Sequence, residues 1–225
     1  MSESAAKISG GQSAFVVHPK QGGRRTNDPA RRTPEASLAE AVGLAQAIGL
    51  TVRHAEVVSV QTPNPKTFLG EGRITTMKGV IAEEKIDVLI INDGEARALG
   101  QDSNLVKVAK QVLARGPKHL IIKRGEYGVL MFNGTQVFGA PAFPLEDVRD
   151  PTGAGDTFAG GFLGYLAATG NRSPEAMKQA IIFGSVMASF TVESFSLDRL
   201  RILDYKEIQA RFQEFKRLTH FEDVS

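Results

Sequence analysis

Hydrophobic positions along the first sixty residues follow a strand, helix, strand order. The run AFVVHP at 14–19 predicts a short buried strand. The next segment is capped by Ser37 and predicts a helix, because its apolar residues recur every three to four positions: Leu38, Val42, Ala45 and Ile48. The stretch TVRHAEVVSV at 51–60 returns to a strand pattern. Together these segments predict one β-α-β unit.

The same alternation continues through the middle of the chain. The segment 69–85, LGEGRITTMKGVIAEEK, has helical spacing, and DVLIIND at 87–93 is the short apolar run of a parallel strand buried on both faces. Helical spacing returns at 104–114, and HLIIKRG at 119–125 predicts another buried strand.

A hairpin and three helices complete the pattern. The segment 128–143 predicts two strands around an Asn-Gly turn at Asn133 and Gly134. Helices are expected to begin near Gly155, Ser173 and Asp204. This order predicts an α/β fold, a three-layer sandwich whose mostly parallel, Rossmann-like sheet carries an antiparallel hairpin at one side.

Composition excludes several kinds of partner and site. The chain of 225 residues is 42% hydrophobic, which suits a globular protein, and its net charge of +2 is too small to indicate a nucleic-acid or membrane partner by itself. It has no cysteine, so disulfides and thiolate metal sites are excluded, and its four histidines lack metal-ligand spacing. No apolar run approaches the roughly 20 residues of a membrane helix, and the start lacks a signal-peptide pattern. We therefore expect a cytoplasmic protein.

The segment 150–162, DPTGAGDTFAGGF, places glycines where a helix is predicted to begin. A helix start carries unpaired N–H groups and the positive end of the helix dipole, so Gly153, Ala154 and Gly155 suit an anion site. Asp156 could accept a proton from an attacking hydroxyl, and the combination indicates phosphoryl transfer. The alternative is an ordinary N-terminal helix acid, with glycines that only permit close helix packing: Gly155, Gly160, Gly161 and Gly164.

The full string at 150–166, DPTGAGDTFAGGFLGYL, resembles the second signature of the PfkB, or ribokinase-like, family of sugar and nucleoside kinases. NDGEAR at 92–97 is similar to that family's N-x-x-E motif, and IKRGEYG at 122–128 resembles its nucleotide-contacting strand and loop. The resemblance implies a ribokinase-like sheet, ATP as the phosphoryl donor, and a small sugar or nucleoside as the acceptor.

The resemblance also implies roles for single residues in the glycine-rich turn. Asp156 would be the base that deprotonates the acceptor hydroxyl. The amides of Gly153, Ala154 and Gly155 would stabilise charge on the transferred phosphoryl group.

Two further groups are implied to contact the nucleotide. Asn92 and Glu95 would act through Mg²⁺ and its waters near the ATP phosphates, and the alternative for both is helix capping after a strand. Lys123, Gly125 and Gly128 would lie along the nucleotide, and the alternative for them is a plain strand end and turn.

Residues 13–90 resemble a different family, the N-terminal domain of the HflX group of ribosome-associated GTPases. The likeness rests on AFVVHP, on SLAEAVGLAQAIGLTVRHAEVV and on the P-x-P-x-T-F-L-G-E-G-R segment. No G-x-x-x-x-G-K-[ST] loop is present, so GTP hydrolysis is not predicted. The expected organisation is a disordered leader at 1–12, HflX-like β-α units at 13–90, and a PfkB-like nucleotide-binding half at 91–225, as a hybrid that shares one continuous sheet.

Three functions remain open at this point. The first is an ATP- and Mg²⁺-binding kinase half whose phosphoryl transfer is impaired, because the half that would hold the acceptor is replaced. The second is a non-enzymatic chimeric α/β scaffold. The third is a ribosome- or RNA-associated module with basic residues on a loop, for which a solvated loop is the alternative: Arg24, Arg25, Arg31 and Arg32. Residues 70–73, GEGR, predict either a second anion site or a capped helix start.

Overall fold

The computed structural model describes residues 13–21, 51–60, 87–134, 136–195 and 198–222, together with single positions at 35, 39, 42 and 46. The chain divides into two compact units, one of residues 1–89 with 97–118 and one of 90–96 with 119–225. Several predicted features lie outside the described residues: the leader at 1–12, the arginine-rich loop, Ser37, the helix at 69–85 and the segment 70–73.

The first unit contains a pair of parallel strands. β1 (Ser13–Gln21) and β2 (Thr51–Val60) are paired along their length, with Val17 opposite Glu56. Positions 35, 39, 42 and 46, which lie between the two strands in sequence, are helical. Parallel neighbours require a crossover connection of this kind, so the predicted β-α-β unit is confirmed.

Two helices follow the strand that was predicted at 87–93. α4 (Leu105–Leu113) begins behind Asn104, whose Oδ1 accepts the amides of Val106 and Lys107 at 2.9 and 3.2 Å. This cap confirms the helix predicted from residue 104. α3 (Asp93–Gly100) was not predicted as a helix, because its eight residues are too few to show a clear apolar period.

The second sheet has four strands in the order β3 (Val88–Asn92), β4 (His119–Lys123), β5 (Val129–Asn133) and β6 (Gln136–Ala140). β5 is antiparallel to both β4 and β6. The three central residues of β4 are buried, as predicted for a buried strand. Burial on both faces was predicted for 87–93, but in β3 it alternates between buried and half-buried positions, so that prediction is corrected. Two predictions stay open: that the parts at 13–90 and 91–225 share one continuous sheet, and that the boundary between them lies near residue 90.

The hairpin turn begins one residue later than predicted. Asn133 pairs with Gln136 and so belongs to β5, which leaves Gly134 as the first residue of the turn. Gly134 has a φ of +56°, a left-handed conformation that glycine adopts without a Cβ penalty. The glycine, and not the asparagine, therefore supplies the positive φ of this turn.

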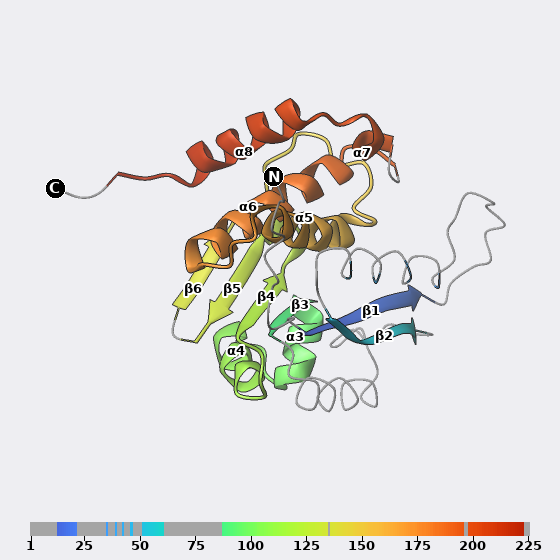
Figure 1. Ribbon diagram of the computed structural model, residues 1–225, viewed down its shortest axis with the longest axis vertical. Helices are drawn as coiled ribbons and strands as arrows, with labels where there is room; N and C mark the ends of the chain where they lie inside the picture. The colour runs from blue at the N-terminus through green and yellow to red at the C-terminus, as the bar shows by residue number, and fades with distance from the viewer. Residues whose placement is uncertain are drawn as a thin grey trace, which may run out of the picture. The chain divides into compact units, whose positions relative to one another are not determined.

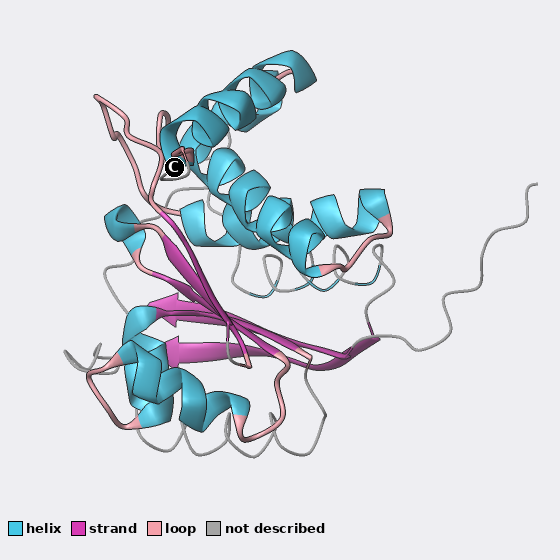
Figure 2. Cartoon of the chain, turned by 90° about the vertical axis from the view of Figure 1, so that its left-hand side faces the viewer, coloured by secondary structure: helices cyan, strands magenta, loops and turns pink. Residues whose placement is uncertain are grey.

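Helices α5 (Ala154–Thr169), α6 (Pro174–Thr191), α7 (Asp198–Ile202) and α8 (Tyr205–Thr219) complete the second unit. Figure 1 and Figure 2 show α5 and α6 along one face of β4, β5 and β6, with α8 outside α6. α6 and α8 begin where predicted, with Ser173 and Asp204 as their caps, whereas the short α7 was not predicted. None of the described helices combines the length and the apolar character that crossing a bilayer would require.

Glycines bring α5 and α6 close together. A Cβ at Gly161 would lie 2.9 Å from Cγ of Met187, and one at Gly184 would lie 2.7 Å from the carbonyl oxygen of Phe158. Gly160 and Gly164, in contrast, have open space where a Cβ would stand. The packing explanation therefore applies to Gly161 and not to the exposed glycines of α5.

Candidate functional site

The turn before α5 presents unpaired amides. Gly153 is the N-cap and has a φ of 84°, which only glycine adopts without strain. The amide of Ala154 donates to the carbonyl oxygen of Pro151 at 3.2 Å, whereas those of Gly153, Gly155 and Asp156 have no hydrogen-bond partner within the described residues. Of the three amides predicted to bind an anion, those of Gly153 and Gly155 are therefore open and that of Ala154 is engaged, and the amide of Asp156, which was not predicted, is open as well.

The end of α6 holds the segment that leads into this turn. The carbonyl oxygen of Val192, the C-cap residue of α6, accepts the amides of Arg149 and Asp150 at 2.8 and 3.3 Å. Asp150 in turn accepts the amide of Thr152 through Oδ1 at 2.9 Å. No side-chain pattern could have indicated Val192, because its contribution is a backbone carbonyl.

Asp156 lies in the first turn of α5 and is exposed. Its carboxylate is therefore open to a hydroxyl that arrives from solvent, beside the unpaired amide of Gly155. A general base must reach the proton that it removes, and an exposed carboxylate next to an anion site satisfies that requirement.

Lys123 reaches the same turn from the end of β4. Its Nζ lies 2.7 Å from the point where a Cβ of Gly155 would stand, so the missing side chain of Gly155 makes room for the ammonium group. Lys123 forms no ion pair with any other described residue. The ammonium group and the positive end of the helix both attract negative charge, so this place favours a bound anion.

Asn92 and Glu95 form a reciprocal cap at the start of α3. The amide of Glu95 donates to Oδ1 of Asn92 at 2.8 Å, and the amide of Asn92 donates to Oε2 of Glu95, also at 2.8 Å. This is the capping arrangement that the alternative prediction described. It leaves Oε1 of Glu95 without a hydrogen bond in the described part of the chain.

The environment of Glu95 shows that three predicted residues lie within electrostatic reach of one another. Burial raises the pKa of Glu95 above its usual value, and the amide of Asn92 and the charge of Lys123 partly oppose that rise. The negative charge of Asp156 raises the pKa of Glu95 further. Glu95, Lys123 and Asp156 therefore come from three separate elements to one place.

The pKa of Glu95 predicts how its substitution changes stability with pH. Because this pKa is higher in the folded chain than the usual 4.5, the contribution of the group to the free energy of unfolding is complete below pH 4.5 and is lost as the pH rises through the folded value. Glu95→Gln keeps an oxygen for the amide of Asn92 but cannot ionise. We expect urea denaturation between pH 4 and pH 8 to show the variant gaining stability over the parent as the pH rises; parallel curves would contradict this.

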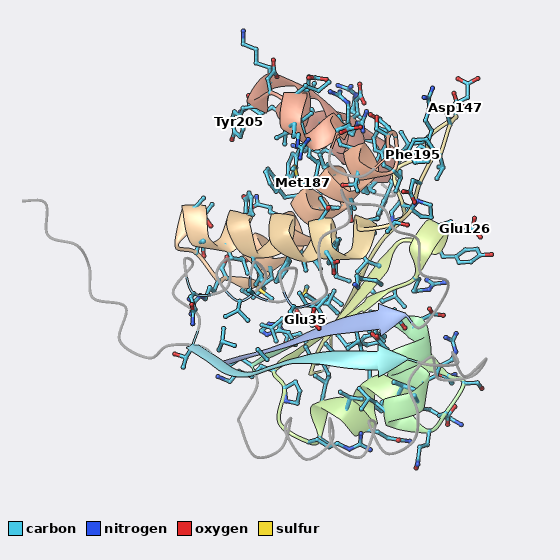
Figure 3. The ribbon with its side chains drawn as sticks, turned by 90° about the vertical axis from the view of Figure 1, so that its right-hand side faces the viewer. Glu35, Glu126, Asp147, Met187, Phe195 and Tyr205 are labelled. Carbon is cyan, nitrogen blue, oxygen red and sulfur yellow. The ribbon has the colours of Figure 1, made fainter. Side chains whose placement is uncertain are left out.

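The loop after β4 owes its shape to two glycines. Gly125 and Gly128 have φ values of +56° and +81°, and they bound a short 3₁₀ turn in which the amide of Gly128 donates to the carbonyl oxygen of Gly125 at 3.1 Å. Glu126, between them, points away from the sheet (Figure 3). The strand end and turn of the alternative prediction account for this geometry, and contact with a nucleotide stays a prediction.

Comparison with known proteins identifies the family. The sequence pattern described as pfkB family carbohydrate kinase matches residues 54–200. This chain belongs to the pfkB family. The match covers the turn before α5, the loop after β4 and the cap of α3, and it begins well ahead of the boundary predicted near residue 90.

Curated relatives in this family match part of the chain. A cytidine kinase from Thermococcus kodakarensis is 39% identical over 85 residues, which are 36% of this chain and 30% of that protein. A ribokinase from Staphylococcus aureus is 30% identical over 113 residues, which are 48% of this chain and 36% of that protein. The matches thus span about a third of each of these two relatives.

Solved structures confirm the fold class. An adenosine kinase from Sinorhizobium meliloti superposes with a TM-score of 0.54 at 23% identity, over 88% of this chain and 54% of that one. An aminoimidazole riboside kinase from Salmonella enterica superposes with a TM-score of 0.56 at 20% identity, over 90% of this chain and 63% of that one. The chain has a ribokinase-like α/β fold, with a mixed sheet and helices packed around it.

Proposed function

We propose that this chain binds ATP with Mg²⁺ and transfers the terminal phosphoryl group to a hydroxyl of a small sugar or nucleoside. The observation that carries the proposal is the meeting of Lys123 with the turn before α5. The ammonium group lies against Gly155 beside two unpaired amides, and the carboxylate of Asp156 is exposed on the same turn. This arrangement supplies an anion site and a base within one turn of helix.

The proposed step uses these groups as follows. Asp156 takes the proton of the acceptor hydroxyl, whose oxygen forms a bond to the γ-phosphorus as the bond from that phosphorus to the bridging oxygen of ADP breaks. The amides of Gly155 and Asp156 and the ammonium of Lys123 stabilise the negative charge on the transferred group. Gly153 and Ala154 form the rest of this turn. Gly125 and Gly128 give the loop after β4 the shape with which it would lie along the nucleotide.

The residues at the start of α3 fit Mg²⁺. This ion favours oxygen ligands, keeps several waters and is usually held by one or two carboxylates together with substrate phosphates. The half-buried carboxylate of Glu95 has one oxygen without a hydrogen bond to any described residue, and Asn92 lies next to it, so both could hold Mg²⁺ through water. The described residues contain no cluster of three side chains that could hold a metal alone, and a water-bridged ion does not need one. When bound, Mg²⁺ would neutralise phosphate charge.

The names of the relatives support the acceptor class. The two curated proteins are called a cytidine kinase and a ribokinase, and a nucleoside and a sugar both offer hydroxyl groups. We extend this class to our chain as a proposal, together with a cytoplasmic location. The hybrid origin of residues 13–90 and an impaired transfer also remain proposals. The parallel pairing of β1 with β2 suits HflX-like β-α units, and the arginines on which the RNA-associated alternative rests lie outside the described residues.

A thermal melt with and without Mg-ATP tests nucleotide binding. We expect a rise in the melting temperature of the parent, because ligand at about 100 times its dissociation constant stabilises a folded protein by about 2.7 kcal/mol. Glu95→Gln should reduce this rise while its own melt without ligand stays at or above that of the parent. Glu214→Gln, an exposed glutamate on α8, is the matched control and should behave like the parent. An unchanged melting temperature of the parent in the presence of Mg-ATP would overturn the proposed function.

Adding a methyl group to Gly155 tests the anion site directly. Gly155→Ala would push the end of Lys123 aside and narrow the approach to the unpaired amides, so we expect the dissociation constant for Mg-ATP to rise roughly tenfold, which is about 1.4 kcal/mol. Gly160→Ala is the control, since it adds the same group to the same helix in open space. Calorimetric titration measures the affinity of both variants for Mg-ATP. Equal affinities would mean that the phosphates do not bind at the turn before α5.

A further inference from the structure

A group of charged residues binds the end of α6 to α7 and α8. Glu193 directly follows Val192, the C-cap residue. Its Oε2 accepts a hydrogen bond from Nε of Arg199 at 3.2 Å, and its Oε1 forms an ion pair with Nη2 of Arg211 at 2.6 Å. The side chain of Arg211 is 16% exposed and that of Glu193 is 22% exposed. Removing one partner of an ion pair that is largely shielded from water is costly, because the remaining charge is left without a partner. We call Glu193, Arg199 and Arg211 the C-terminal clamp.

Arg211 also connects α8 to the segment that leads into the glycine-rich turn. Its guanidinium lies 3.6 Å from the ring centroid of Phe190 and 5.1 Å from that of Phe143, and its Nη1 donates to Oγ of Ser189 at 3.1 Å. Phe143 packs in addition against Phe215 of α8, with ring centroids 5.8 Å apart. Planar stacking of this kind suits arginine and not lysine.

The residues between β6 and α5 form neither helix nor strand, so their position depends on contacts of this kind with other elements. Phe143 is held near the start of the segment by Arg211 and Phe215. Near its end, the amides of Arg149 and Asp150 are held by the carbonyl oxygen of Val192, next to Glu193 of the clamp. The first point of attachment therefore depends on α8, and the second depends on the end of α6.

We propose that Arg211 and Glu193 are positioning residues for the anion site: the C-terminal clamp fixes the end of α6 and the segment after β6, and so holds the turn before α5 in its binding geometry. The inference rests on the proposed function, since its ligand is the phosphate chain of ATP. It gives α8, which carries none of the predicted site residues, a part in binding. Coupling of this kind is reciprocal, so a bound nucleotide should also stabilise α8.

Binding measurements on variants of Arg211 test the proposal. Arg211→Met removes the charge and the hydrogen bonds but keeps apolar contact with Phe190, and we expect the dissociation constant for Mg-ATP to rise roughly five- to tenfold, at the lower end of typical coupling effects. Arg211→Lys should recover part of the affinity by restoring the charge. Arg217→Met, on the exposed side of the same helix, is the control and should leave the affinity unchanged.

Amide hydrogen exchange separates positioning from general destabilisation. In Arg211→Met we expect faster exchange in peptides that cover 149–157 and unchanged exchange in β4 and β5; in the parent, Mg-ATP should slow exchange in α8. A folded variant that melts lower but keeps both its affinity and its exchange at 149–157 would overturn the inference. If Arg211→Met does not fold, Glu193→Gln is measured in the same way. If the parent fails to bind Mg-ATP, the proposed function fails, and exchange at 149–157 in the variants still decides the positioning role.

Discussion

Asp156→Asn is expected to lower the turnover of phosphoryl transfer by about 100-fold to 10,000-fold, the range that general-base catalysis contributes. Asparagine has nearly the shape of aspartate but cannot take the proton of the acceptor hydroxyl. The amides of Gly155 and Asp156 belong to the backbone, so the variant should keep the anion site and its affinity for Mg-ATP. Coupled detection of ADP release with a panel of sugars and nucleosides measures turnover, and the melt with Mg-ATP measures binding.

The control for this variant is Asp147→Asn. Asp147 is an exposed carboxylate on the segment that leads into the same turn, and it points outward (Figure 3). Its substitution removes the same charge from the same region without touching the site. Undiminished turnover in Asp156→Asn would assign the base to another residue. A parent that binds Mg-ATP but transfers to no acceptor would support the proposal that transfer is impaired.

Gly128→Ala is expected to destabilise the fold by about 3 kcal/mol or more, the combined effect of a left-handed backbone and an overpacked contact. A Cβ at this position would lie 2.1 Å from the carbonyl oxygen of Ala140 and 2.5 Å from the carbonyl carbon of Pro141. Both are backbone atoms, which cannot turn aside as the end of a side chain can. Urea denaturation of the parent and the variant measures the loss.

Gly134→Ala separates the two causes. Gly134 also has a positive φ, +56°, but nothing lies within 4 Å of its Cβ position. This variant should therefore lose only the backbone part, about 1–2 kcal/mol. Equal losses in the two variants would mean that β6 and the residue after it move away from the added methyl group, and that the close contact at Gly128 has little cost.

Local signals predicted the elements that are defined by neighbours in sequence. The helix starts near Asn104, Ser173 and Asp204 were predicted correctly, and in the structure the side chain of each of these residues caps the helix that follows it. The same reasoning could not decide the role of Asn92 and Glu95. A reciprocal cap and a magnesium site use the same two residue types at the same spacing, and the structure shows the cap while leaving one carboxylate oxygen unpaired.

By itself, the sequence determined the α/β class, the buried strand β4, the positions of the long helices and the family signature, because each depends on residue type and spacing within one segment. Only the tertiary structure decided that Gly161 serves helix packing whereas Gly155 makes room for Lys123, and that Val192 and Arg211 contact the segment before the turn. These roles depend on which atoms meet across segments that are far apart in the chain. The space beside a glycine or a carbonyl depends on the residues that lie next to it in the folded chain. The spacing of residues along one segment therefore does not predict it.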